Sequence, residues 1–160
     1  MSSSKPANDA RTQQSALRYL RTGTRSAAEL QRFLQSRGIA PTRIRTLLTE
    51  GRRRGWLDDA ACAALVATSL SDRGYAARLI AQRLAAKGLG DSLIARTLAR
   101  LNADVDDASR ALAFVRARAG GRRTDDRLRA RLGRALAARG FDADLISQVL
   151  VEALGPVDPP

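Results

Sequence analysis

The sequence contains no histidine and only one cysteine in 160 residues. The absence of imidazole removes the usual general base and the commonest metal-ligating side chain. The cysteine, Cys62, lies in an alanine-rich stretch with no histidine or lysine nearby to activate it. We therefore interpret Cys62 as a buried packing residue rather than a nucleophile.

Long apolar runs and aromatic residues are also scarce. Aromatic side chains make up 4% of the sequence, and no stretch is long and apolar enough to span a bilayer. No apolar segment of the kind found in secretory signals follows the N-terminus. Together with the single cysteine, these absences lead us to expect a cytoplasmic protein that has no membrane contact.

Patterns typical of β-strands are missing as well. No run of residues alternates between apolar and polar with a period of two, and glycine and proline are concentrated at junctions. The sequence therefore predicts the all-α fold class. The hydrophobic content is 44%, but much of it is alanine, so each core is expected to be small and stability must come from stacking.

A pattern of two short amphipathic helices joined at a glycine occurs three times, most clearly from Arg73 to Leu98. The joining glycines are 50 residues apart (38 to 88) and then 52 (88 to 140). A period near 50 residues predicts an array of repeated units that stack on their neighbours. The aligned columns are Leu30/Ile80/Leu132, Leu34/Leu84/Leu136, Arg37/Lys87/Arg139, Gly38/Gly88/Gly140, Ile39/Leu89/Phe141, Ile44/Ile94/Ile146 and Leu48/Leu98/Leu150.

We therefore expect three tandem three-helix repeats in an elongated array. The expected divisions are a disordered tail over 1–8, repeats over 9–55, 56–102 and 103–155, and a C-terminal tail over 156–160. In the first repeat, Asp9 is expected to cap the first helix. In the second, a helix over 59–72 carries Leu65, Val66 and Leu70 as its large apolar side chains.

Three pairs of aspartates stand at predicted helix starts: Asp58-Asp59, Asp106-Asp107 and Asp125-Asp126. Such pairs also occur in acid/base and metal sites, but capping and the helix dipole explain carboxylates at these positions. We expect Asp58-Asp59 to supply a cap and a first-turn residue, and Thr124 to cap the helix that contains the third pair. With no phosphate-binding loop either, we predict no active site, no enzymatic activity, no metal and no cofactor.

Charge is the most extreme property of the chain, with 28 basic residues and a formal net charge of +12. Residues 1–55 hold 12 basic and 3 acidic side chains, a net +9, whereas 56–105 carry +1 and 106–160 carry +2. This excess implies an anionic partner, either nucleic acid or an acidic protein surface. The first third of the chain is the expected contact.

The arginine run Arg52, Arg53 and Arg54 is followed closely by Trp56. Such a run is often a solvated helix end, but here it falls in the most basic third, so a binding role is at least as plausible. Trp56 and Tyr75 are expected to anchor contacts between helices. The alternative for Trp56 is stacking on a partner or a base beside the arginines.

The segment GWLDD, followed by RGYAARLIAQRLAAKGL, resembles the RecX family, the bacterial regulators of the RecA recombinase. The specific pieces are 55–59, 73–75 and 87–89, and the resemblance extends over nearly the whole chain. One departure is that Ala61 and Cys62 stand where the family usually has an arginine and a phenylalanine. This departure thins the core of the fourth helix and puts in doubt any contact that the family makes through that arginine.

The resemblance implies a curved helical array and a non-enzymatic inhibitor. It would lie in the groove of the RecA–DNA filament, block filament extension, and suppress ATP hydrolysis, strand exchange and coprotease action in recombination and the SOS response. The partners would be the RecA filament and single- or double-stranded DNA, with the chain itself a monomer. The alternative function is that of a general basic helical nucleic-acid-binding protein. The candidate partner- or DNA-binding residues are Arg37, Arg43, Arg45, Arg52, Arg53, Arg54, Trp56, Arg73, Tyr75, Arg83 and Lys87.

Overall fold

The computed structural model describes residues 4–120 and 125–156, and these form nine α-helices and no strand. This confirms the predicted all-α class. The helices are α1 (Ser4–Leu20), α2 (Ala27–Ser36), α3 (Pro41–Arg53), α4 (Asp59–Asp72), α5 (Ala77–Ala86), α6 (Asp91–Asp104), α7 (Asp107–Ala119), α8 (Asp126–Ala137) and α9 (Ala143–Leu154).

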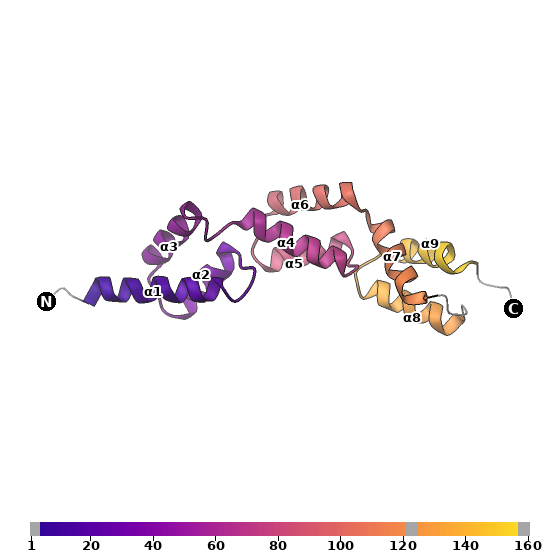
Figure 1. Ribbon diagram of the computed structural model, residues 1–160, viewed down its shortest axis with the longest axis horizontal. Coiled ribbons are helices and arrows are strands. Elements are labelled where there is room, and N and C mark those ends of the chain that lie inside the picture. The colour runs from indigo at the N-terminus through magenta and orange to yellow at the C-terminus, as the bar shows by residue number, and fades with distance from the viewer. Residues whose placement is uncertain (1–3, 121–124, 157–160) are drawn as a thin grey trace.

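The helices are arranged as an elongated, curved array with the two ends of the chain at opposite ends of the molecule (Figure 1). Helices α1–α3, α4–α6 and α7–α9 follow one another along the long axis. We refer to these sets as the first, second and third units. This arrangement places the three units end to end, as in a repeat array in which each unit contacts only its neighbours.

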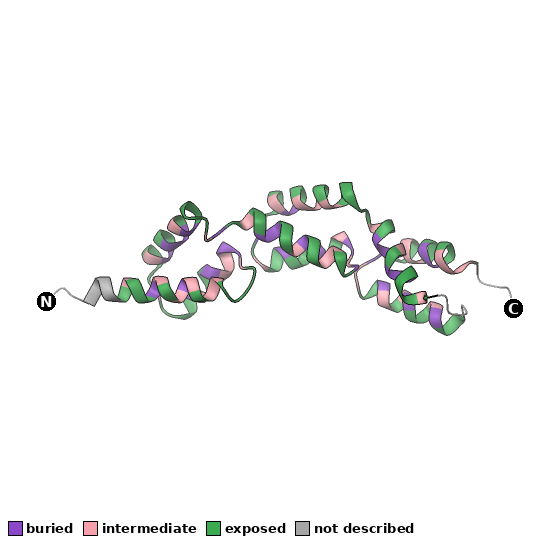
Figure 2. Cartoon of the chain, in the orientation of Figure 1, coloured by how far each residue is buried: buried purple, intermediate pink, exposed green. Residues whose placement is uncertain are grey.

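Each unit has its own small hydrophobic core, and buried residues lie where the helices of a unit face one another (Figure 2). Leu30, Leu34 and Leu47 are at most 2% exposed in the first core. Ile80 and Leu84 are fully buried in the second. The third core contains the fully buried Leu136 and Val115. The columns Leu30/Ile80/Leu132 and Leu34/Leu84/Leu136 are at most 2% exposed and contribute one residue each to every core.

Capping residues set several helix starts, among them the cap predicted at Asp58. Ser26 and Glu29 form a complete capping box at α2, and Pro41 occupies the first position of α3. The side chain of Asp58 accepts a hydrogen bond from the Ala61 N–H at 2.8 Å. These interactions satisfy N–H groups that have no partner inside the helix.

Two predicted helix starts were wrong. Helix α1 begins at Ser4, so Asp9 is not its cap and residues 4–8 are helical rather than a disordered tail. The physical reason is tertiary, because Asp9 pairs with Arg43 of α3 across 3.1 Å. At α8 the cap is Asp125, which accepts from the Leu128 N–H at 2.7 Å; the proposed cap Thr124 lies outside the described residues.

Helix α4 packs mainly through small residues. Its buried side chains are Cys62, Ala63 and Ala67, which confirms the packing role predicted for the cysteine. Burial in this apolar setting raises the pKa of the Cys62 thiol, so the thiol stays protonated and unreactive. Leu65, by contrast, is 62% exposed. Small side chains allow α4 to approach its neighbours closely, and this leaves the larger Leu65 outside the core.

The same contact joins the first unit to the second and the second to the third. The Ala27 N–H at the start of α2 donates to the Asp59 carboxylate of α4 at 2.8 Å. In the same way, the Ala77 N–H of α5 donates to the Asp107 carboxylate of α7 at 2.9 Å. The middle helices of the first two units, α2 and α5, therefore have their N-terminal turns bound by a carboxylate from the next unit, where the helix dipole favours negative charge.

The start of each of these helices also rests on the glycine turn that ends the middle helix of the next unit. The Ser26 hydroxyl donates to the Lys87 carbonyl at 2.5 Å, and the Ala76 N–H donates to the Arg139 carbonyl at 3.0 Å. At the first of these contacts, a Cβ on Gly88 would lie 2.5 Å from the Cβ of Ala28. The absence of a side chain at this position therefore allows the units to approach closely.

Candidate partner-binding surface

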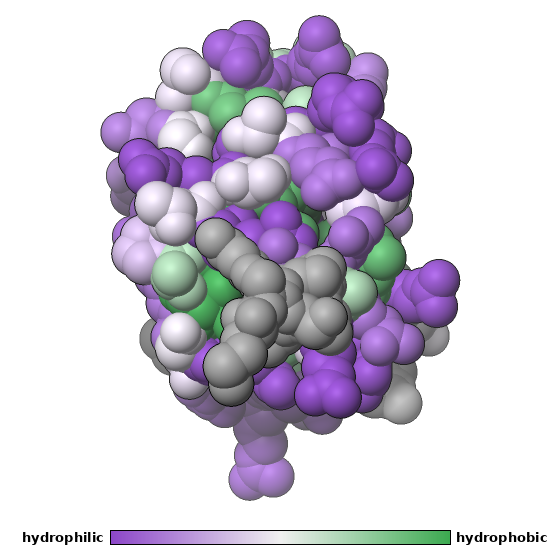
Figure 3. Space-filling view, turned by 90° about the vertical axis from the view of Figure 1, so that its left-hand side faces the viewer, coloured by the Kyte–Doolittle hydropathy of each residue, from purple (hydrophilic) through white to green (hydrophobic). Residues whose placement is uncertain are grey.

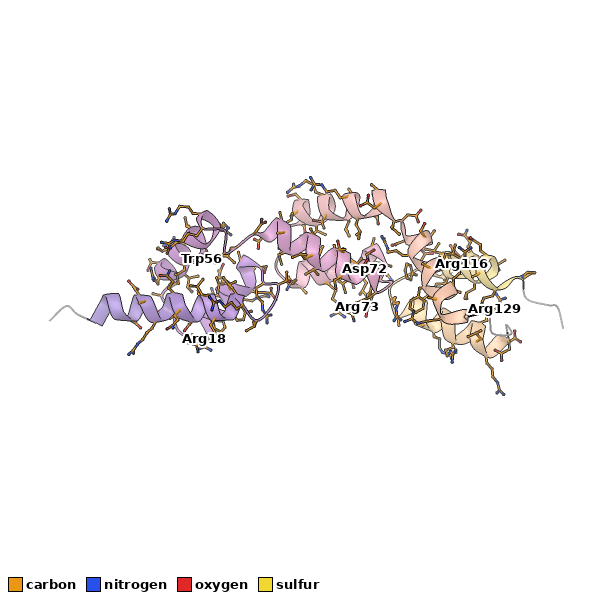
Figure 4. All side chains as sticks on the ribbon, in the orientation of Figure 1. Arg18, Trp56, Asp72, Arg73, Arg116 and Arg129 are labelled. Carbon is orange, nitrogen blue, oxygen red and sulfur yellow. The ribbon has the colours of Figure 1, made fainter. Side chains whose placement is uncertain are left out.

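The candidate binding residues do not form one site. Trp56 lies at the end of the first unit, and Arg73 lies at the end of α4 in the second unit, well separated from it (Figure 4). One group surrounds α3 and the arginine run. The other gathers where the first unit meets the second and contains Arg73, Tyr75, Arg83 and Lys87.

Within the first group, we call the exposed side of α3 around Arg45 and Arg53 the α3 basic face. Arg45 and Arg53 share one side of α3 with Glu50 and three threonines, around an open depression of about 640 Å³. This side is exposed because Ile44, Leu47 and Leu48 turn the opposite side of α3 into the core. Guanidinium groups and hydroxyls on one helix face match the donors that bind phosphate oxygens. The residues lining the depression are Thr42, Arg45, Thr46, Thr49, Glu50 and Arg53.

Arg54 and Trp56 adjoin this face. A terminal nitrogen of Arg54 lies 2.8 Å from the Glu50 carboxylate, and its guanidinium lies over the Trp56 ring, 5.2 Å from the ring centre. Trp56 is half-buried, and its backbone N–H donates to the Gly51 carbonyl at 2.8 Å. These contacts hold Trp56 against the C-terminal end of α3, and its proposed stacking on a partner or a base stays a prediction.

Arg43 and Arg37 make contacts within the first unit. Arg43 is half-buried and binds Asp9 through both the carboxylate and the backbone carbonyl, so it holds α1 against α3. The Arg37 guanidinium lies 4.5 Å from the centre of the Phe33 ring, which itself stacks on Tyr19 at 4.1 Å. Arg37 is exposed and remains accessible to a partner.

The N-terminal end of the molecule is covered mostly by hydrophilic side chains (Figure 3). This agrees with the net charge of +9 in residues 1–55. Arg52, Arg53 and Arg54 are all exposed at the end of α3. The first unit therefore offers a largely solvated cationic surface, as expected for electrostatic attraction of an anionic partner.

The second group of residues lines an open groove of about 610 Å³, which we call the inter-unit groove. It receives Thr24 and Glu29 from the first unit and all its other residues from α4, α5 and the turns that follow them. Its lining residues are Thr24, Glu29, Leu65, Val66, Ser69, Leu70, Arg73, Tyr75, Arg83, Ala86 and Lys87.

Lys87 and Glu29 form an ion pair across the boundary of the two units. The Lys87 Nζ lies 2.8 Å from Glu29 Oε2 and also donates to the Thr24 carbonyl at 2.9 Å. Partial burial acts to raise the pKa of Glu29, but hydrogen bonds from Lys87 and from the Ser26 N–H outweigh it and hold the pKa below its ordinary value. Lys87 is thus held in place by the first unit, whereas Arg83 is exposed.

Tyr75 is half-buried beneath two arginines. The guanidinium of Arg73 lies 5.3 Å from the ring centre and that of Arg139 lies 5.6 Å from it. Arg139 also lies 4.2 Å from the Phe114 ring centre, and desolvation together with the charge of Arg118 lowers its pKa. Tyr75 therefore connects the second unit to the third, as predicted for an aromatic that anchors contacts between helices.

Sequence reasoning missed two features of this region. One is the exposure of Leu65, which the sequence analysis grouped with Val66 and Leu70 as a large apolar side chain of its helix and which the structure turns toward solvent. The other is Arg110, which is 4% exposed and binds Asp107, Asn102 and the Val105 carbonyl. Its spacing of three residues from Asp107 was visible in the sequence, but its burial was not.

The described residues contain no group of three or more His, Cys, Asp or Glu side chains placed to hold a metal ion. In residues 4–120 and 125–156, no helix has the length and apolar character needed to cross a membrane. The features that do stand out are cationic side chains on an exposed helix face and a groove lined by both apolar and cationic side chains. Both are suited to holding an anionic partner.

Comparison with known proteins agrees with this fold. Residues 104–150 match the family model described as RecX, third three-helix domain. Regulatory protein RecX from Leptothrix cholodnii is 33% identical over 135 residues, which cover 84% of each chain. A crystal structure of RecX from Lactobacillus salivarius superposes with a TM-score of 0.71 at 19% identity, over 92% of this chain and 97% of that one. Another crystal structure of regulatory protein RecX superposes with a TM-score of 0.65 at 21% identity, over 88% of this chain and 70% of that one.

Proposed function

The chain belongs to the RecX family of regulatory proteins, and from this membership we propose that it is a negative regulator of the RecA recombinase. The observation that carries the proposal is the 33% identity over 84% of both chains. In the proposed mechanism the array lies in the groove of the RecA–DNA filament and blocks filament extension. ATP hydrolysis, strand exchange and coprotease action by the filament then fall.

The elongated shape supports this mode of binding. Three units in line present a surface much longer than a compact domain of the same size, so one molecule can contact more than one filament subunit. The contacts between units, through Asp59 and Asp107, join these surfaces into one array. Inhibition then needs only occupancy of the groove and no chemistry, so we propose a non-enzymatic monomer that acts in the cytoplasm, where RecA works.

The charge distribution suggests where the first contact forms. The α3 basic face lies in the segment that carries +9 of the total +12. Exposed arginines attract a filament built around DNA phosphates and raise the rate of encounter. We propose that Arg45, Arg52 and Arg53 reach either phosphates or an acidic surface of the filament.

A second candidate function is favoured by the same charge: a general nucleic-acid-binding protein whose contact with RecA is secondary. The two candidates differ in what they predict without RecA. A general binder retains DNA at moderate salt, and log affinity falls steeply with log salt concentration. A filament regulator binds the assembled filament much more tightly than the same DNA alone.

The test is ATP hydrolysis by RecA on single-stranded DNA with increasing amounts of the chain. Wild type is expected to lower the rate, and the triple variant Arg52→Ala, Arg53→Ala, Arg54→Ala is expected to inhibit less. Its melting temperature should hardly change, because surface substitutions usually stay within about 0.5 kcal/mol. If phosphates are contacted, the slope of log affinity on log salt falls by up to about one unit per lost contact.

The matched control is the pair Arg127→Ala and Arg131→Ala, both exposed on α8 in the third unit. Arg129 is unsuitable as a control because it is half-buried and donates to the Gly155 carbonyl at 2.6 Å. A triple variant that inhibits as well as wild type, beside a control pair that does not, would place the binding surface at the other end of the array.

A further inference from the structure

We propose that the inter-unit groove binds a protein segment that combines carboxylates with at least one large apolar side chain. The inference rests on the proposed function, because we assign this segment to the RecA filament. It adds a second contact, distinct from the α3 basic face, with a partner of different chemistry. Three properties of the groove support it: its apolar floor, its cationic rim, and the covering of its only aromatic ring.

The α4 side chains Leu65, Val66 and Leu70 form an apolar patch in the groove, which we call its floor. Among them, Leu65 is 62% exposed. Burial of the exposed part of Leu65 against an apolar side chain is favourable, so this residue is placed to contact an apolar partner. The groove is open to solvent and has a volume of about 610 Å³, so a side chain of a docked segment can enter it.

The rim of the groove carries positive charge. Arg73 and Arg83 are exposed and stand at the ends of α4 and α5, while Lys87 is already paired with Glu29. The only acidic lining residue, Glu29, is therefore compensated by Lys87 and by Arg25, which lies 3.7 Å away. The uncompensated charge comes from the two arginines, and it selects carboxylates on the incoming segment.

A protein segment fits this groove better than nucleic acid does. Phosphates and sugars cannot bury Leu65, Val66 and Leu70, and a base would need a free aromatic face on which to stack. Tyr75 does not offer one readily, since the guanidiniums of Arg73 and Arg139 lie over its ring. The apolar floor and the covered ring thus argue for leucine-like side chains in the groove, with carboxylates against its rim.

The groove exists only where the two units meet, because Thr24 and Glu29 come from the first unit. An occupant therefore contacts both units and adds to the Lys87–Glu29 ion pair that joins them. We expect binding at the groove to tighten this joint and to hold the array in the shape that matches the filament.

The first experiment places a benzoylphenylalanine photo-crosslinker at position 65 and irradiates the full chain with RecA assembled on single-stranded DNA. The expected product is a crosslink to RecA within a segment that contains both acidic and large apolar residues. A crosslink to DNA, or none while inhibition of ATP hydrolysis is intact, overturns the proposal.

The second experiment does not depend on RecA. A fluorescein-labelled peptide built from repeats of Glu-Leu-Leu-Glu is titrated with the chain and followed by anisotropy. We expect binding that weakens about fivefold or more in Leu65→Ser and in Arg73→Glu, Arg83→Glu, since exposed ion pairs and one apolar contact are lost. The matched control is Arg96→Glu, Arg100→Glu, two exposed arginines on α6 that line a different depression.

Two comparison probes complete the titration: the same peptide with lysine in place of glutamate, and a single-stranded oligonucleotide. Equal binding of the lysine peptide, or oligonucleotide binding that is lost in the groove variants, contradicts the proposal. A chain that binds the acidic peptide through the groove but does not inhibit RecA would contradict the proposed function alone. A chain that inhibits RecA, with no groove crosslink and no peptide binding, would contradict the groove alone.

Discussion

Substitution of Gly88 by alanine tests whether the units stack through their glycine turns. Gly88 has a φ of +76°, and its added Cβ would lie 2.5 Å from the Cβ of Ala28 in the first unit. Neither Cβ can move by side-chain rotation, so the two units must separate. Gly38, the aligned position in the first unit, has a φ of +71° and would meet nothing within 4 Å.

The two substitutions share one cost and differ in another. Alanine at a positive φ costs about 1–2 kcal/mol at either position. At Gly88 the steric overlap adds about 1–3 kcal/mol, the usual cost of overpacking. For a chain of this size each kcal/mol corresponds to about 2–4 °C in melting temperature. We therefore expect Gly88→Ala to melt about 2–12 °C below Gly38→Ala.

The assay is thermal unfolding followed by circular dichroism, with Ala28→Gly as a second-site test. Removal of the Ala28 Cβ should relieve the overlap. The double variant Ala28→Gly, Gly88→Ala is therefore expected to regain the part of the melting temperature that Gly88→Ala loses beyond Gly38→Ala. Equal melting of Gly88→Ala and Gly38→Ala would refute the reasoning. It would show that the first two units do not pack through this turn.

Two further predictions concern the second core and the joint between units. Leu84→Asp should destabilise by at least about 4 kcal/mol, because Leu84 is fully buried; Leu65→Asp, on the same unit but exposed, should stay within about 0.5 kcal/mol in chemical denaturation. Glu29→Gln should destabilise at neutral pH and not at low pH. Because the pKa of Glu29 in the folded chain lies below its ordinary value of 4.5, the ionised carboxylate stabilises the fold fully at pH values above 4.5. This contribution is lost as the pH falls through the folded-state pKa. A difference in unfolding free energy between Glu29→Gln and wild type that stays constant from about pH 3 to pH 7 would contradict the role of the ion pair.

The fold was predictable because its signals are local or periodic. The aligned leucines and isoleucines set the inner faces of the helices, and Ser26 with Glu29 marked the start of α2. A capping interaction spans three residues, so a sequence reveals it directly. The same holds for Asp58, whose hydrogen bond to Ala61 lies within one turn.

Contacts between distant parts of the chain were not predictable in this way. Asp59 was expected in a first turn and is there, but its hydrogen bond to Ala27 spans 32 residues. The pairing of Asp9 with Arg43 likewise depends on how α1 lies against α3. Such partners follow from packing geometry, which no sequence period specifies.

The candidate site was foreseen in its residue types and not in its arrangement. Charge density singled out the arginines of the first third, and the resemblance singled out Arg73, Tyr75 and Lys87. That Lys87 is held by Glu29, and that Leu65 faces solvent beside Arg73, emerged only from the fold. Composition thus indicates an anionic partner. The division of the candidate residues between a basic helix face and a groove depends on the positions of the helices, which composition does not give.

The most direct test of the central claim is co-sedimentation of the chain with RecA filaments assembled on single-stranded DNA with a non-hydrolysable ATP analogue. The same DNA without RecA, at the same moderate salt concentration, is the reference. The account predicts that the chain sediments with the filament and stays largely in solution with DNA alone. Equal retention by DNA with and without RecA would contradict it and would identify a general nucleic-acid-binding protein instead.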